Sequence, residues 1–132
     1  MAEQTSSKKF IWIGRILSGF IVLFLLFDAI IHVLNIPPVM QASHLLGMPD
    51  NMAFIAGILE FVCLGLYLLP KTSILGAILL TGYLGGAVAT NLRAEMPLFS
   101  NTLFPVYVGL FVWGGLFFRE KRVREIIPFF KR

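Results

Sequence analysis

The ionisable residues Asp28, His32, Glu60 and Arg93 lie within or at the end of long apolar stretches of the sequence. A charged group near the centre of a bilayer costs about 2.5–3.5 kcal/mol on insertion scales, so such residues generally pair, carry protons or bind a ligand. Carboxylates and imidazoles can accept protons and hydrogen bonds, and a guanidinium donates to carbonyl or carboxylate oxygens. These four side chains are therefore the first candidates for a polar site.

The composition predicts the elements that carry them. Of 132 residues, 58% are hydrophobic, 14% are charged and 13 are phenylalanine. Apolar runs of about 20 residues match the hydrocarbon thickness of a bilayer, and such runs cover residues 10–34, 51–69, 73–92 and 101–118. They do not alternate as barrel strands do. We therefore predict one all-α membrane domain over residues 1–132, a transmembrane four-helix bundle with antiparallel, up-down helices.

Basic residues set the predicted orientation. Lys8, Lys9, Lys71 and the basic residues of 119–132 all fall on one side of a four-span topology, and only Arg93 falls on the other. The positive-inside rule then predicts cytoplasmic N and C termini for a multi-pass protein, which we assign to a bacterial cytoplasmic membrane. The net charge of +4 fits this orientation and a basic interfacial tail at 119–132, and we reject nucleic acid as a partner.

Other interpretations of single segments or residues, such as a signal peptide, disulfide chemistry or a metal site, have less support in the sequence. Residues 10–29 follow two lysines, as in a signal peptide, but the apolar stretch is too long and no small-x-small cleavage site follows. The single cysteine, Cys63, rules out dithiol–disulfide exchange by this chain alone. His32 and His44 are weak evidence for haem or metal, so we expect no metal site. No cofactor is evident from the sequence.

Small residues share helical faces with the ionisable groups. In lipid, small side chains let helix backbones approach closely, so these faces should point into the bundle. The face carrying Asp28 and His32 has small residues, as do the faces of Glu60 and Arg93. The predicted packing seam consists of Gly14, Ser18, Gly57, Gly82, Gly86 and Ala89. The pair Gly82 and Gly86 could instead form a dimer face, so a homo-oligomer stays open.

Depth along the helices predicts a cavity. At 1.5 Å per residue, His32 and Arg93 lie near the outer interface, with Asp28 and Tyr107 roughly 9 Å deeper and Glu60 roughly 13 Å down. We infer a polar cavity that opens to the outer side, with Glu60 toward its floor. The candidate ligand-binding residues are Asp28, His32, Glu60, Thr90, Asn91, Arg93 and Tyr107.

Two interpretations of the polar cluster are open. In the first, Asp28 pairs with Arg93 across the helices, with His32 one turn above Asp28 as a hydrogen-bonding or titrating group. In the second, these groups satisfy one another and only hold the bundle together. Glu60 is either a proton-carrying carboxylate or a protonated acid that donates a hydrogen bond.

Three segments resemble the DoxX-like family of small four-helix membrane proteins: "GRILSGFIVLFLLFDAIIHV", "LGAILLTGYLGGAVATNLR" and "PLFSNTLFPVYVGLFVWGGLFFR". The resemblance covers most of residues 11–119. The resembling positions are Asp28, Gly82, Gly85, Gly86, Asn91, Arg93, Pro97, Phe99, Ser100 and Pro105. The resemblance implies a link to quinone-dependent sulfur oxidation or thiol stress for some members, and an assembly or trafficking role for distant relatives.

We therefore consider two classes of function. In the first, the cavity binds a lipid-soluble ligand such as a quinone and serves a redox partner, because this chain carries no redox-active group of its own. Arg93 and Asn91 would donate to a carbonyl oxygen, and Asp28 or Glu60 would carry protons. In the second, the chain is a non-enzymatic assembly or scaffold factor for another membrane protein. A small-solute transporter is a weaker third hypothesis.

Overall fold

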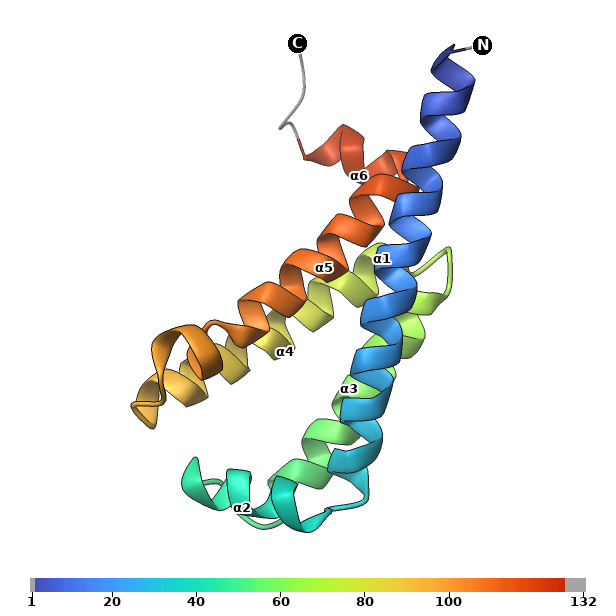
Figure 1. Ribbon diagram of the computed structural model, residues 1–132. Helices are drawn as coiled ribbons and strands as arrows, with labels where there is room; N and C mark the ends of the chain where they lie inside the picture. Colours follow the sequence, from blue (N-terminus) through green and yellow to red (C-terminus); the bar gives the residue numbers. More distant parts are fainter. Residues whose placement is uncertain (1, 128–132) are drawn as a thin grey trace.

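A computed structural model describes residues 2–127 and shows an all-helical protein (Figure 1). Helices account for 83% of the structure, and residues 2–127 contain no strand, which confirms the predicted all-α class. The long helices are α1 (Ala2–Val33), α3 (Met52–Leu68), α4 (Ser73–Arg93) and α5 (Phe104–Arg119). Three short helices join or follow them: α2 (Pro37–Leu45), the π-helix η1 (Leu98–Thr102) and α6 (Lys121–Ile126).

Within residues 2–127, three segments are long and apolar enough to cross a membrane. They are Lys8–Val33 in α1, Ser73–Arg93 in α4, and Leu98–Arg119, which combines η1 with α5. Helix α3 is apolar but has only 17 residues. At 1.5 Å per residue it spans about 25 Å, somewhat less than the roughly 30 Å hydrocarbon core.

The long helices contact one another in a ring. Helix α1 packs against α3 and α5, and α4 packs against the same two helices. Figure 1 shows that the pair α1–α3 and the pair α4–α5 meet near α6 and diverge toward α2 and η1. The described part of the molecule therefore has a convergent end near α6 and a divergent end near α2 and η1.

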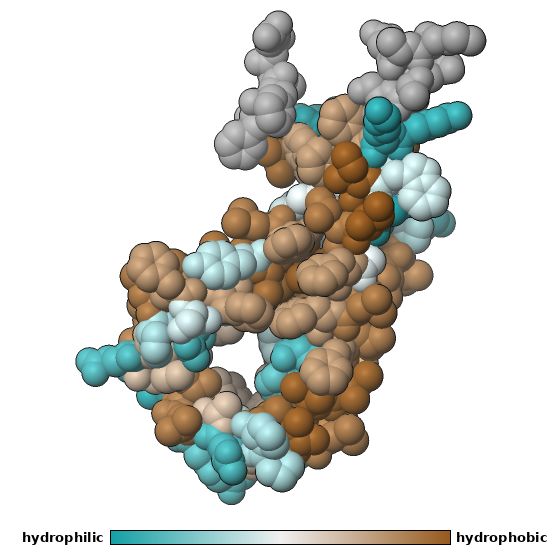
Figure 2. Space-filling model, viewed as in Figure 1, coloured by the Kyte–Doolittle hydropathy of each residue, from teal (hydrophilic) through white to brown (hydrophobic). Residues whose placement is uncertain are grey.

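The apolar core occupies the convergent end. Leu64, Leu80 and Leu116 are buried there, from α3, α4 and α5. The buried Tyr67 hydroxyl donates a hydrogen bond of 2.8 Å to the Val112 carbonyl oxygen and lies 3.2 Å from Ser18 Oγ. Large apolar side chains also cover the outside of the long helices, as expected for surfaces in contact with lipid (Figure 2).

Close backbone approach occurs at Gly14 of α1, Gly57 of α3 and Gly76 of α4, but not at Gly82 or Gly86 of α4. A Cβ at Gly14 would lie 2.7 Å from the Arg119 backbone nitrogen, and one at Gly57 would lie 3.0 Å from the Ala29 carbonyl oxygen. Ser18 is buried against α5. By contrast, a Cβ at Gly82 or Gly86 would meet no atom within 4 Å. Glycine at these two positions therefore does not form the inward seam expected from the sequence.

Ala89 belongs to the same exposed face of α4 as Gly82 and Gly86. Helix α4 instead buries the side that carries Gly76, Ala77, Leu80 and Leu84. The sequence predicted that Gly82, Gly86 and Ala89 face inward because they share a helical face with Arg93. Arg93 is the last residue of α4, beyond the part that packs on other helices, so its position does not determine which face of α4 is buried.

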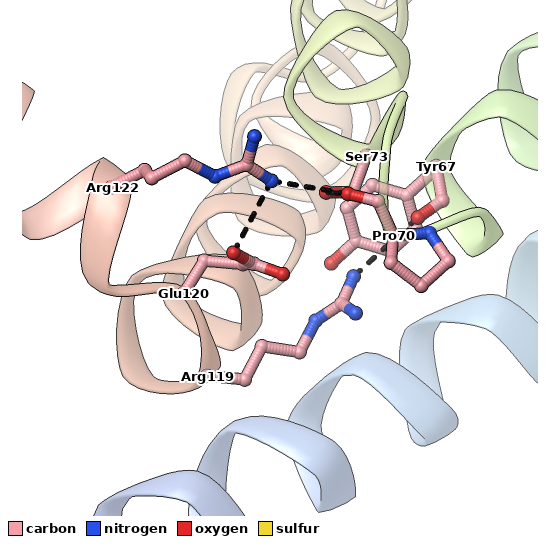
Figure 3. Close-up of polar contacts among 6 residues, drawn as sticks. All are labelled: Tyr67, Pro70, Ser73, Arg119, Glu120 and Arg122. Atoms are coloured by element: carbon pink, nitrogen blue, oxygen red, sulfur yellow. Dashed lines mark hydrogen bonds and ion pairs between the residues drawn. The ribbon is translucent and has the colours of Figure 1, made fainter.

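Polar contacts fasten α5 and α6 to the turn between α3 and α4 (Figure 3). The Arg119 guanidinium lies 5.0 Å from the Tyr67 ring centroid and donates to the Tyr67 carbonyl oxygen at 3.5 Å. Arg122 donates to the Pro70 carbonyl oxygen at 3.1 Å and lies 3.5 Å from a Glu120 carboxylate oxygen. Part of the predicted basic tail therefore packs on the protein, whereas residues 128–132 lie outside the described residues.

Candidate functional site

A cavity of about 340 Å³ lies at the divergent end, between α1, α2, α3 and α4. Figure 2 shows an opening in this part of the molecule, with hydrophilic residues on the side formed by α1 and α3. Most of the lining is apolar and comes from side chains such as Ile31, Val39 and Ala56. The polar lining residues are Asp28, His32, Ser43, Tyr83, Thr90 and Asn91.

Asp28, His32 and Glu60 form a compact polar cluster beside this cavity. Each offers one ligand or hydrogen-bonding atom, and these atoms all lie within 4.8 Å of one another. His32 Nδ1 lies 2.7 Å from the Asp28 carbonyl oxygen and 3.4 Å from Asp28 Oδ2. Glu60 is completely buried, and its Oε2 accepts a hydrogen bond of 3.3 Å from the Tyr83 hydroxyl. Its Oε1 has no hydrogen-bond partner among the described residues.

Helix geometry explains why these side chains meet. Asp28 and His32 are four residues apart on α1 and therefore share one face. Gly57 lies three residues before Glu60, where α3 comes close enough to α1 that a Cβ would contact Val33 and Ala29. Because Gly57 and Glu60 share a helical face, this close approach brings the Glu60 carboxylate to the polar face of α1.

Arg93 does not form the expected ion pair with Asp28. The Arg93 guanidinium instead donates a hydrogen bond to the Leu46 carbonyl oxygen, at the C-terminal end of α2. Gly47 follows with a positive φ of 70°, which turns the chain toward Arg93. Carbonyl groups at a helix C-terminus carry partial negative charge and attract a cation, so α2 provides the partner that the sequence analysis assigned to Asp28.

Thr90 and Asn91 line the α4 side of the cavity, but their hydrogen bonds are partly used within the protein. Thr90 Oγ1 donates to the Gly86 carbonyl oxygen at 2.8 Å. Asn91 Nδ2 donates to the Asn101 carbonyl oxygen at 3.1 Å and so joins α4 to η1. Asn91 retains a second N–H and its carbonyl oxygen for other partners.

Tyr107 differs in position from the sequence interpretation. It is exposed and does not line the cavity, and its hydroxyl donates to the Phe99 carbonyl oxygen at 3.2 Å. His44 pairs with Asp50 at 2.7 Å on the exposed surface and does not line the cavity either. Depth alone suggested Tyr107, but depth does not specify the side of α5 on which a residue lies.

Tyr83 was missed by the sequence analysis, although a signal for it exists. It precedes Thr90 by seven residues, so the two lie on nearly the same face of α4. Ser43, also missed, belongs to α2, which lies between the predicted segments 10–34 and 51–69. The sequence analysis likewise did not consider Asp28, His32 and Glu60 together as metal ligands, because the metal hypothesis paired His32 with His44.

The fold and the polar cluster define the class of molecule: an all-helical membrane protein with a cluster of ionisable groups between its helices. The chain belongs to the DoxX-like family, whose sequence profile matches residues 16–115. Similar sequences were found neither among curated proteins nor among solved structures. The matched region includes the cavity-lining parts of α1, α3 and α4 and so extends over the whole candidate site.

Proposed function

We propose that α1, α3, α4 and α5 form a transmembrane four-helix bundle with both termini in the cytoplasm of a bacterial cell. Arg122 of α6 donates to Pro70, the residue before Lys71, and the part of α1 that follows Lys8 packs on Arg119, so these basic residues lie at the convergent end. Arg93 contacts Leu46 beside α2 and lies at the divergent end. This distribution supports an orientation in which the convergent end is cytoplasmic and the cavity faces outward. Helix α3, with its 17 residues, would be accommodated by a small local thinning of the bilayer.

We further propose that the cavity binds a lipid-soluble ligand with a polar head, of the quinone or quinol class. One observation carries this proposal: a 340 Å³ cavity that is apolar over most of its wall and polar where Asp28 and His32 meet. Small-molecule sites typically combine an apolar cavity of about 300–1,000 Å³ with a few placed polar groups. A quinone has the same division between an apolar body and carbonyl oxygens.

In this proposal, the polar residues in and beside the cavity have different roles. The free N–H of Asn91 is the donor toward a carbonyl oxygen of the ligand, and the Asp28 carboxylate is the acceptor or proton carrier. Glu60 lies behind Asp28. It can relay a proton to Asp28 or fix the position of the Asp28 carboxylate. Arg93 acts indirectly, since it holds α2 across the cavity. Electrons would leave through a separate redox partner protein.

Ligand-dependent thermal stabilisation tests this function. We expect a short-chain ubiquinone or menaquinone analogue to raise the unfolding midpoint of the detergent-solubilised protein, because a ligand that binds only the folded state stabilises it. His32→Gln should weaken this effect. His44→Gln is the matched control, because His44 pairs with a carboxylate as His32 does but lies outside the cavity. Equal stabilisation of both variants, or none of the wild type, would contradict quinone binding in this cavity.

A second candidate function rests on the exposed glycines of α4. Gly82, Gly85 and Gly86 leave open space around α4 in the described structure, and small residues favour close helix association in lipid. This observation favours an assembly or scaffold role in which a helix of another membrane protein packs on α4. A stoichiometric partner that co-purifies with the wild type and is lost in Gly86→Leu would support this role. Retention of that partner by the variant would exclude this surface.

A further inference from the structure

The two carboxylates of the Asp28–His32–Glu60 cluster have no lysine or arginine partner among the described residues. Among residues 8–127, no lysine or arginine forms an ion pair with either carboxylate, and the ion pair of Asp28 is with His32. Two carboxylates held close together repel each other strongly in a low-dielectric environment. A positive charge in the cluster would offset this repulsion.

Glu60 provides an independent indication of a ligand. Its side chain is completely buried, yet Oε1 has no hydrogen-bond partner among the described residues. A buried carboxylate oxygen without a partner is costly, because the lost hydration is not replaced. Glu60 is also one of the three residues whose ligand atoms lie within 4.8 Å of one another. A bound cation would satisfy the unpartnered oxygen.

His32 has the hydrogen bond typical of a metal-binding histidine. Its Nδ1 lies 2.7 Å from the Asp28 carbonyl oxygen, and a carbonyl can only accept, so Nδ1 carries the hydrogen. In the neutral imidazole, the form that binds metals, the lone pair is then on Nε2. Metal-ligating histidines commonly donate their other ring N–H to a backbone carbonyl in this way, which fixes the tautomer and the ring orientation.

We propose that Asp28, His32 and Glu60 bind one divalent transition-metal cation of the Zn²⁺ or Mn²⁺ class. Two carboxylates neutralise the charge of the ion, and the imidazole favours such metals over Mg²⁺ or Ca²⁺. Two ligands at about 2.1 Å from one zinc ion lie at most about 4.2 Å apart. The 4.8 Å within which one ring nitrogen of His32 and one oxygen of each carboxylate lie is close to that limit. Because Asp28 and His32 line the cavity, the remaining coordination position faces it.

The metal site shares Asp28, His32 and Glu60 with the proposed quinone site, but it does not rest on that function, because the metal needs no quinone to bind. The test titrates Zn²⁺ alone into chelator-stripped protein in detergent and measures affinity and stoichiometry by calorimetry. We expect one ion per chain. His32→Gln and Glu60→Gln should each weaken binding at least about tenfold, the lower range found for loss of even an outer partner of a metal ligand.

His44→Gln is the control, since His44 and Asp50 form an exposed histidine–carboxylate pair on the same chain. We expect this variant to bind Zn²⁺ as the wild type does. Asp28→Asn replaces Glu60→Gln if the latter does not fold. Absence of stoichiometric Zn²⁺ binding in the wild type, binding unaffected by the cluster variants, or binding lost in His44→Gln would each overturn the proposal.

Discussion

Individual hydroxyl groups join the helices where the molecule is most tightly packed. Tyr67 of α3 donates to a carbonyl of α5 and lies within hydrogen-bonding distance of Ser18 on α1, so one side chain joins three helices. The Tyr67 ring also supports the Arg119 guanidinium. Interhelical hydrogen bonds within membranes contribute about 0.6 kcal/mol on average and up to about 1.7 kcal/mol. Tyr67 should lie in the upper part of that range.

We predict that Tyr67→Phe lowers the free energy of unfolding by about 1–2 kcal/mol, because the Val112 carbonyl oxygen loses a buried donor. Denaturant unfolding in detergent micelles measures the change. Tyr107→Phe is the matched control, since the Tyr107 hydroxyl also donates to a carbonyl oxygen but the residue is exposed. An equal loss in both variants would contradict the role assigned to the Tyr67 hydroxyl.

The separation of Asp28 from Arg93 can be tested by a double-mutant cycle. Arg93 donates to the Leu46 carbonyl oxygen rather than to Asp28, so the effects of Asp28→Asn and Arg93→Gln on stability should add. Additivity within about 0.5 kcal/mol is typical of residues that share no partner. Unfolding free energies of the wild type, both single variants and the double variant give the coupling. A coupling above about 1 kcal/mol would show that the two side chains interact.

Residue patterns predicted one part of the site better than another. Asp28 and His32 were placed on one face because helical periodicity is local, and Glu60 was placed nearby because it shares a face with small residues. The partner of Arg93 could not be predicted in this way. It depends on the carbonyl of Leu46 and the positive φ of Gly47, which belong to a non-periodic connection.

At the scale of elements, periodicity and hydrophobicity located the long helices, whereas turns and short helices were harder. The predicted segment 73–92 corresponds to α4, which spans Ser73–Arg93. The predicted segment 51–69 corresponds to α3, which spans Met52–Leu68. Helix α2 lies between the predicted segments 10–34 and 51–69 and was not predicted; it begins with Pro37 and Pro38. Proline fits the first turn of a helix, where its missing N–H has no intrahelical acceptor.

The close packing of α1 and α3 gives a prediction for glycine. Gly57→Ala should lower the free energy of unfolding by about 1–3 kcal/mol, since its Cβ would lie 2.8 Å from Val33 Cγ2 and 3.0 Å from the Ala29 carbonyl oxygen. Gly86→Ala has open space and better helix propensity, so it should be neutral or slightly stabilising. Thermal or denaturant unfolding measures the stability of the two variants relative to the wild type. A neutral Gly57→Ala would disprove the close contact that brings Glu60 to α1.

At the scale of the whole molecule, the main feature is the divergence of the helix pairs α1–α3 and α4–α5. They pack tightly at one end through a core of large side chains and separate at the other, where the cavity and the ionisable cluster lie. This arrangement lets charged groups contact water or a ligand inside a structure whose outer surface is apolar. Loss of the divergence would leave Asp28 in a dry interior, at a cost of several kcal/mol per ion.

Cysteine accessibility tests this arrangement most directly. In a Cys63→Ala background, Ala56→Cys places a thiol on the cavity wall, and Ile58→Cys places one two residues away on the exposed apolar surface of α3. The thiolate is the reacting form, and an apolar environment disfavours it. Gln41→Cys, exposed on α2, serves as the accessible reference.

The measurement is the labelling of each variant by a membrane-impermeant maleimide added outside intact cells. With an outward-facing polar cavity between the helices, the Ala56→Cys and Gln41→Cys variants should react, and the Ile58→Cys variant should not. Labelling of Gln41→Cys alone, or equal labelling of Ala56→Cys and Ile58→Cys, would contradict a water-filled cavity facing the outside.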